Sequence, residues 1–241
     1  MNRLYVWDLP VRLFHWLLAF GIAFAVVAGK LGGNWIVWHG RAGLFILGLV
    51  TFRIVWGFVG SATARFSTFV RGPAAIKAYL RGEWKGIGHN PLGALSVLAL
   101  LALVAVQVGT GLLANDDIAY QGPLADLVGK AQSNALTGIH HLLVNALYAV
   151  AALHVAAIVF YVRVKRENLL KPMVTGWKEV NAEGVPEALA VCPHHPSGAR
   201  RLAAFVAATA IASSTVYAAA GGLLPPTAAP VTAPAATQPA W

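Results

Sequence analysis

The chain has 241 residues, of which 58% are hydrophobic and only 11% are charged. Soluble domains carry about 25% charged residues, so this composition excludes an ordinary soluble protein and predicts several membrane spans of about 20 residues each. A net charge of +9 in so apolar a chain indicates basic loops on one membrane face, and we expect no nucleic-acid partner. The single cysteine, Cys192, excludes an internal disulfide and a thiolate-ligated cluster.

Four apolar stretches in chain order are long enough to be spans. They run from about Leu13 to Gly29, Trp35 to Phe58, Leu92 to Leu113, and Ala135 to Val162. A less hydrophobic fifth stretch, Leu202–Gly222, is rich in the small residues that let helices pack closely in lipid. We therefore predict an all-α membrane protein, with a four-helix transmembrane bundle and a fifth transmembrane helix.

Composition divides the chain into four parts. We expect a transmembrane domain over residues 1–178, a polar connecting loop over 179–200, a fifth transmembrane helix over 201–222 and a Pro/Ala-rich outer tail over 223–241. Within the first part, Pro73 is placed to open a short interfacial helix that ends at Leu80.

The distribution of basic residues fixes the orientation of the spans. With the N-terminus inside, every Lys and Arg except Lys30, Arg41 and Lys130 falls on the inner side of this topology. Basic loops face the cytoplasm, so we expect membrane lipid around the bundle, a cytoplasmic N-terminus and an outer C-terminus.

Four histidines lie within the spans at two matching depths. His140 and His154 are 14 residues apart, close to four helical turns, so they share a helix face and are separated by about 21 Å of rise. The topology brings His39 to the outer level of His140, and His15 to the inner level of His154. We expect the pairs His39/His140 and His15/His154.

Paired imidazoles at membrane depth are typical of functional sites, because polar groups there are costly. Two imidazoles are a suitable axial set for a haem held between helices. A single histidine is more often bonded to a neighbouring carbonyl, but four at matched depths favour ligation. Zinc or copper also bind imidazole, yet neither a carboxylate nor a thiolate accompanies the pairs.

Arginines and a polar turn are further candidates. Arg53 continues the face of His39 to the inner level and is placed to pair with a haem propionate, as Arg41 is at the outer level. The alternative for each is an interfacial arginine that reaches toward water. His89 and Asn90, before the third span, are candidates for a quinone site or proton path, or simply a helix cap.

With the histidines placed, residues 4–178 resemble the bacterial di-haem cytochrome b561 proteins and the b-type cytochrome subunits of nickel–iron hydrogenases. The resemblance rests on WDLPVRLFHW around His15, WHGRAG around His39, FRIVWGFVGSATARFSTF, GHNPLGAL, GTGLLANDD, IHHLLVNALYAVAALH and NLLKPMVTGWK. It implies two b-type haems in the bacterial inner membrane, with iron ligated by the two histidine pairs. The charge topology places the outer C-terminus in the periplasm. The same-face spacing selects His140 rather than His141 as the ligand.

The resemblance implies electron transport in a respiratory chain, between the quinone pool and a periplasmic c-type cytochrome or redox enzyme subunit. One alternative is a stand-alone superoxide:quinone oxidoreductase, and another is a haem-containing membrane anchor subunit. The sequence leaves open whether the chain is an enzyme by itself, the direction of electron flow and the role of the fifth helix.

Overall fold

A computed structural model of the chain describes residues 2–83, 90–118, 120–180 and 198–225. Within them, five helices are long and apolar enough to cross a membrane, which confirms the predicted all-α membrane fold. They are α1 (Leu9–Leu31), α2 (Trp35–Val59), α5 (Pro91–Leu112), α6 (Lys130–Arg163) and α9 (Gly198–Ala219). The chain is a multi-pass membrane protein.

The helix starts follow from capping residues in the sequence. Asp8 accepts a hydrogen bond from the backbone N–H of Val11 at 2.9 Å and so begins α1. Asn90 does the same for Gly93 at 2.7 Å and begins α5. A proline follows each cap within the first turn, where its missing N–H costs nothing.

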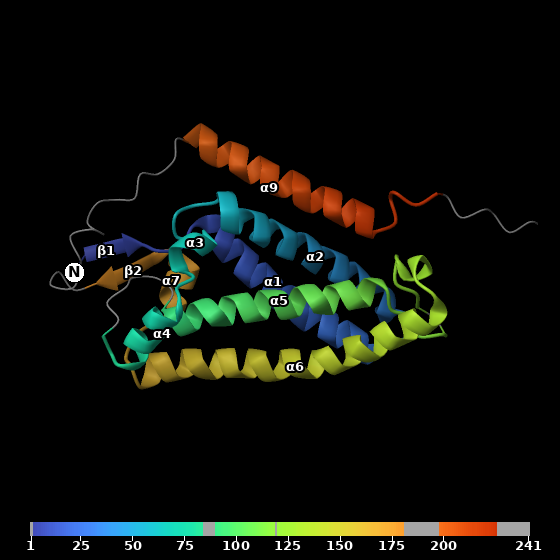
Figure 1. Cartoon of the computed structure of the whole chain (residues 1–241), viewed down its shortest axis with the longest axis horizontal. Coiled ribbons are helices and arrows are strands. Elements are labelled where there is room, and N and C mark those ends of the chain that lie inside the picture. The colour runs from blue at the N-terminus through green and yellow to red at the C-terminus, as the bar shows by residue number, and fades with distance from the viewer. Residues whose placement is uncertain (1, 84–89, 119, 181–197, 226–241) are drawn as a thin grey trace, which may run out of the picture.

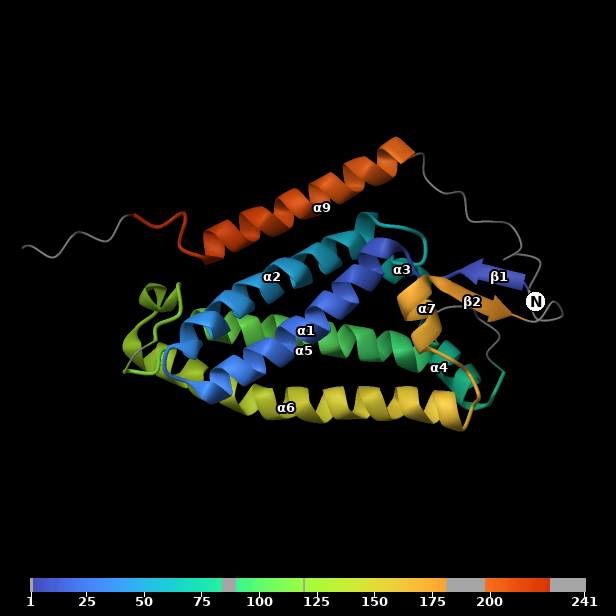
Figure 2. The same cartoon turned by 180° about the vertical axis from the view of Figure 1, so that it is seen from behind.

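Helices α1, α2, α5 and α6 form a bundle, and α9 lies along its outside against α2 (Figures 1 and 2). The bundle core consists of small and branched apolar residues: Ala25, Ala42, Ile46, Val50, Leu101, Val104, Val108 and Leu147. Phe205 of α9 packs edge-on against Phe52 and Trp56 of α2, at ring-centroid distances of 5.6 and 6.2 Å. Van der Waals packing of this kind drives helix association in lipid.

One end of the bundle carries a small polar cap that the sequence did not predict. Strand β1 (Asn2–Tyr5) pairs antiparallel with β2 (Trp177–Val180), just after the short helix α7 (Leu170–Thr175). The same end carries the short helices α3 (Phe66–Phe69) and α4 (Pro73–Leu80), the second of which was predicted (Figure 1). The opposite end carries a loop with the 3-10 helix η1 (Ala125–Leu127).

Three helix starts differ from the sequence prediction. Helix α1 begins at Leu9 rather than near Leu13, because the capping residue Asp8 starts the helix before the apolar run. Helix α6 begins at Lys130 rather than near Ala135, because its polar first turns continue the helix beyond the apolar run. Helix α9 spans Gly198–Ala219 rather than starting at Leu202. The expected loop starting at residue 179 begins with the end of β2, and most of that loop and of the C-terminal tail lie outside the described residues.

Candidate functional site

The structure brings together the four intramembrane histidines in the two predicted pairs. The rings of His15 on α1 and His154 on α6 have centroids 6.4 Å apart, at the end of the bundle that carries the strands. The rings of His39 on α2 and His140 on α6 have centroids 5.9 Å apart, toward the opposite end. We call them the inner and outer pairs, following the topology predicted from charge.

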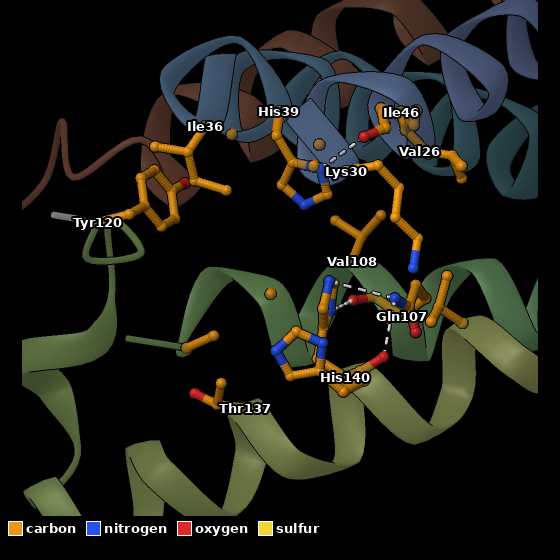
Figure 3. Close-up of a pocket in the computed structure, with 18 of the residues that line it drawn as sticks. Val26, Lys30, Ile36, His39, Ile46, Gln107, Val108, Tyr120, Thr137 and His140 are labelled. Carbon is orange, nitrogen blue, oxygen red and sulfur yellow. Dashed lines mark hydrogen bonds between the residues drawn. The ribbon is translucent and has the colours of Figure 1, made fainter. Parts of the chain in front are cut away.

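A cavity of about 430 Å³ lies at the outer pair (Figure 3). Its lining is mostly apolar and includes Ile46, Val104, Val108 and Leu147. His39 enters from α2 and His140 from α6, and the two side chains face one another across the space (Figure 3). Small-molecule and cofactor sites commonly have such volumes, apolar walls and few polar groups.

Two glycines make room for the outer rings. A Cβ on Gly29 would lie 2.8 Å from Nδ1 of His39, and a Cβ on Gly111 would lie 3.0 Å from Cε1 of His140. Any larger residue would therefore push a ring toward the cavity. Each glycine thus accommodates an imidazole.

Hydrogen bonds fix the same tautomer in both outer histidines. Nδ1 of His39 lies 2.8 Å from the backbone oxygen of Ala25, and Nδ1 of His140 lies 2.9 Å from that of Gln107. A carbonyl oxygen only accepts, so each Nδ1 must carry the proton and donate it. Each Nε2 then keeps its lone pair, the form in which imidazole binds a metal.

Helix α5 contains no histidine but holds His140 in place. The side-chain amide of Gln107 donates to the backbone oxygen of His140 at 3.1 Å and lies 3.2 Å from its Nε2. The hydroxyl of Thr110 lies 3.3 Å from Nδ1 of the same ring. Sequence reasoning missed both residues, although a glutamine inside an apolar span was a usable signal.

Lys30 and Tyr120 also line the cavity, and the sequence analysis did not assign either of them to it. Lys30, at the end of α1, extends its ammonium group toward the cavity (Figure 3). Tyr120, from the outer loop, packs its hydroxyl against Gly40. Burial raises the pKa of Tyr120, so its phenol stays neutral at physiological pH.

The inner pair has a different environment. Nδ1 of His15 is buried and has no hydrogen-bond partner within the described part of the chain. Trp16 meets the ring of His15 edge-on at 5.1 Å and donates its indole N–H to the backbone oxygen of Met173 at 3.3 Å. Helix α7 thus contacts Trp16, the residue that follows His15.

The remaining predicted site residues lie as follows. Arg53 is 3% exposed, with its guanidinium 4.9 Å from the ring centroid of Phe66. Arg41 is exposed and stacks on Trp38 at 4.7 Å, outside the lining of the outer cavity.

Two histidines and the cap residue of α5 complete the set. His141 lines the outer cavity and meets His140 edge-on at 6.2 Å, but it is His140 whose ring contacts His39. Asn90 caps α5 and donates to the hydroxyl of Tyr161 at 2.9 Å. His89 lies outside the described residues.

These residues fit a haem at each histidine pair. Two imidazoles that bind one metal from opposite sides, through bonds of about 2 Å, have ring centroids roughly 6 Å apart. Both observed separations, 5.9 and 6.4 Å, match that arrangement. Among the described residues no group of three or more His, Cys, Asp or Glu is placed to hold a metal ion.

Comparison with known proteins gives a consistent assignment. The family described as prokaryotic cytochrome b561 matches residues 6–176. A protein of Azotobacter chroococcum mcd 1, named "Probable Ni/Fe-hydrogenase B-type cytochrome subunit", is 30% identical over 215 residues, which cover 73% of this chain and 89% of that protein. A protein of the same name from Rhodobacter capsulatus is 27% identical, with coverages of 73% and 81%.

A more distant relative matches only part of the chain. The "Probable Ni/Fe-hydrogenase 1 B-type cytochrome subunit" of Escherichia coli (strain K12) is 25% identical over 138 residues, which cover 44% of this chain and 58% of that protein. No solved structure matches the chain. The family match ends before α9, so that helix is additional to the family pattern.

Proposed function

The chain belongs to the prokaryotic cytochrome b561 family, and from this premise we propose that it carries electrons across the bacterial inner membrane through two b-type haems. Residues 1–178 form the electron-transfer domain. We assign His39 and His140 as the axial ligands of an outer haem, and His15 and His154 as those of an inner haem. The N-terminus is cytoplasmic and the C-terminus periplasmic, as the basic loops indicate.

The observation that carries the proposal is the shared hydrogen-bond pattern of the outer pair. Both rings donate from Nδ1 to a helix carbonyl, so that Nε2 carries the lone pair in each ring, and the Nε2 of His140 lies 3.2 Å from the side-chain amide of Gln107. A merely structural histidine has no need of an apolar cavity of about 430 Å³ beside it. The glycines at positions 29 and 111 support the same conclusion, because they leave that space open.

Bound haem supplies a one-electron couple at iron, and the protein orients it and excludes water. His39 and His140 are held by backbone carbonyls, so the ligands are positioned before the cofactor enters. Apolar residues of α2 and α5 surround the outer site, and Tyr120 covers the side nearest the outer loop. Lys30 is the cation best placed to pair with a haem propionate.

We propose a redox enzyme subunit or a c-type cytochrome as the periplasmic partner and quinone as the membrane partner. The relatives' names associate them with Ni/Fe hydrogenases, which supports an enzyme subunit. Asn90, bonded to Tyr161 at the inner end of the bundle, supports a polar quinone or proton site there. His89 belongs to the same proposal through its position in the sequence.

A pyridine haemochrome assay on the purified full-length chain tests the proposal. We expect two b-type haems per chain, with two midpoint potentials in a redox titration. His140→Ala should remove one haem, while His141→Ala should retain both. A chain with no haem, or loss of the haem from His141→Ala instead, would contradict the assignment. Oxidation of the quinol-reduced protein by a soluble cytochrome distinguishes a conduit from an anchor subunit.

A further inference from the structure

The outer and inner pairs differ in the hydrogen bonds made by Nδ1. In the outer pair both Nδ1 atoms donate to backbone oxygens, at 2.8 Å to Ala25 and 2.9 Å to Gln107. In the inner pair, Nδ1 of His15 is buried and has no partner in the described part of the chain.

A hydrogen bond from Nδ1 alters the donor strength of the opposite nitrogen. An imidazole whose N–H is donated to a strong acceptor gains electron density at Nε2 and becomes a more basic ligand. A more basic axial ligand stabilises ferric iron more than ferrous iron, because the ferric state carries the larger positive charge. Axial ligation and hydrogen bonding around it are therefore recognised determinants of haem potential.

We propose that the Nδ1–H···O=C bonds of His39 and His140 make the outer haem the lower-potential one of the two. The inference rests on the proposed function, since it requires a haem at each pair. The backbone carbonyls of Ala25 and Gln107 act as positioning groups that tune the two ligands. The inner pair, in which His15 makes no such bond within the described residues, has a weaker donor in His15 and holds iron at the higher potential.

Two features near His140 bear on the size of the effect. Gln107 donates its side-chain amide to the backbone oxygen of His140, which fixes the turn that carries the ligand. The charge of Lys30 acts in the opposite direction, because a nearby cation disfavours ferric iron and so raises the potential of the outer haem. Lys30 lies at an exposed helix end, where water and salt screen its charge. Hydrogen bonds made directly by the ligands are not screened in this way.

Single-ligand variants of the full-length protein test the order of potentials. In His154→Ala the outer haem remains, and in His140→Ala the inner haem remains. We expect the single spectroelectrochemical transition of His154→Ala to lie at a more negative potential than that of His140→Ala. Equal potentials or the reverse order would overturn the inference. The proposed function fails separately, if the unmodified chain contains fewer than two haems.

A second measurement applies to the unmodified protein if a variant loses both haems. Right-side-out membrane vesicles are poised between the two midpoint potentials and frozen, so that only the lower-potential haem remains ferric. An impermeant nickel chelate outside the vesicles should then accelerate relaxation of the remaining ferric EPR signal. A signal that relaxes only when the chelate is inside the vesicles assigns the lower potential to the inner haem and refutes the proposal.

Discussion

Gly29 of α1 lies directly against the imidazole of His39 on α2: a Cβ at this glycine would come within 2.8 Å of Nδ1, the atom that donates to Ala25. A tight turn at Gly32 and Gly33 lies between the two residues in the sequence, and both of these glycines have positive φ angles. The turn returns the chain so that the outer ligand is positioned against the helix that precedes it.

Gly29→Ala should therefore displace His39 and break its bond to Ala25. We expect about half of the haem of the unmodified protein, because the outer site is lost and the inner site is unaffected. Gly109→Ala is the matched control, since a Cβ there meets no atom within 4 Å. Haem content by pyridine haemochrome is the measurement. A full complement of haem in Gly29→Ala would show that the close approach does not constrain the site.

Lys30→Met should weaken haem binding at the outer site. A charge-assisted bond to a carboxylate contributes about 1.5–3 kcal/mol, which corresponds to roughly a 10- to 100-fold change in affinity. The rate at which apomyoglobin extracts haem from the purified protein measures the effect. Lys130→Met is the control, because Lys130 pairs with Asp117 at 3.1 Å on an exposed helix start. Equal rates for the two variants would exclude Lys30 as a propionate partner.

Asp8→Asn should destabilise the bundle. Asp8 is 1% exposed and accepts from the backbone of Val11 and from the indole of Trp56, each at 2.9 Å. If the side-chain oxygen of the asparagine still accepts from Val11, its NH2 group faces the indole N–H of Trp56, and that indole has no acceptor. We therefore expect the free energy of unfolding to fall by about 1.5–3 kcal/mol. Thermal unfolding in detergent measures it.

The indole contact has its own control. In a Trp56→Phe background, Asp8→Asn should cost distinctly less, because no indole N–H is left without an acceptor. An equal cost in both backgrounds would assign the effect of Asp8 to the helix cap alone.

The pair of strands β1 and β2 should be less stable at acid pH. The hydrogen bond from Lys171, at 2.7 Å, and its charge lower the pKa of Glu179 below its ordinary value of about 4.3. Since the folded-state pKa is depressed, the stabilisation is present above the unfolded pKa and is lost as pH falls through the folded pKa. The melting temperature of the unmodified protein should exceed that of Glu179→Gln near pH 6. The two should converge below pH of about 4.

Lys171→Met provides the control for that pH dependence. In its background, Glu179→Gln should change the melting temperature less near pH 6, with the remaining effect due to Arg3, whose guanidinium lies 3.9 Å from the Glu179 carboxylate. A difference between unmodified protein and Glu179→Gln that persists unchanged into acid would rule out this ion pair as the source of the stabilisation.

The spans and the histidine pairs were predictable because each depends on a local pattern. A run of about 20 apolar residues specifies a membrane helix, and a 14-residue spacing brings two side chains to one helix face. Charge asymmetry then gave each histidine a depth, and the observed pairs have the predicted partners. Ligation itself remains a prediction for the haem assay.

The polar contacts around the site were not predictable in the same way. Lys30 lies at the end of an apolar span in the sequence, and no local pattern indicates that it lines the outer cavity. Arg41 stacks on Trp38, a contact that the sequence analysis did not indicate, and its role toward a propionate stays a prediction. The four-residue strands β1 and β2 lie over 170 residues apart, so no local pattern indicates their pairing.

The spacing of 14 positions between His140 and His154 also sets the fraction of the membrane potential that lies between the two histidine levels. This spacing corresponds to about 21 Å along α6, which is about two-thirds of a hydrocarbon core of about 30 Å. At about 2.3 kcal/mol per 100 mV for a full crossing, an electron moving between these levels exchanges about 1.6 kcal/mol with the membrane field per 100 mV. Under the proposed function, the spacing of two histidines on one helix makes electron transfer itself an electrogenic step, so an inside-negative membrane opposes inward flow.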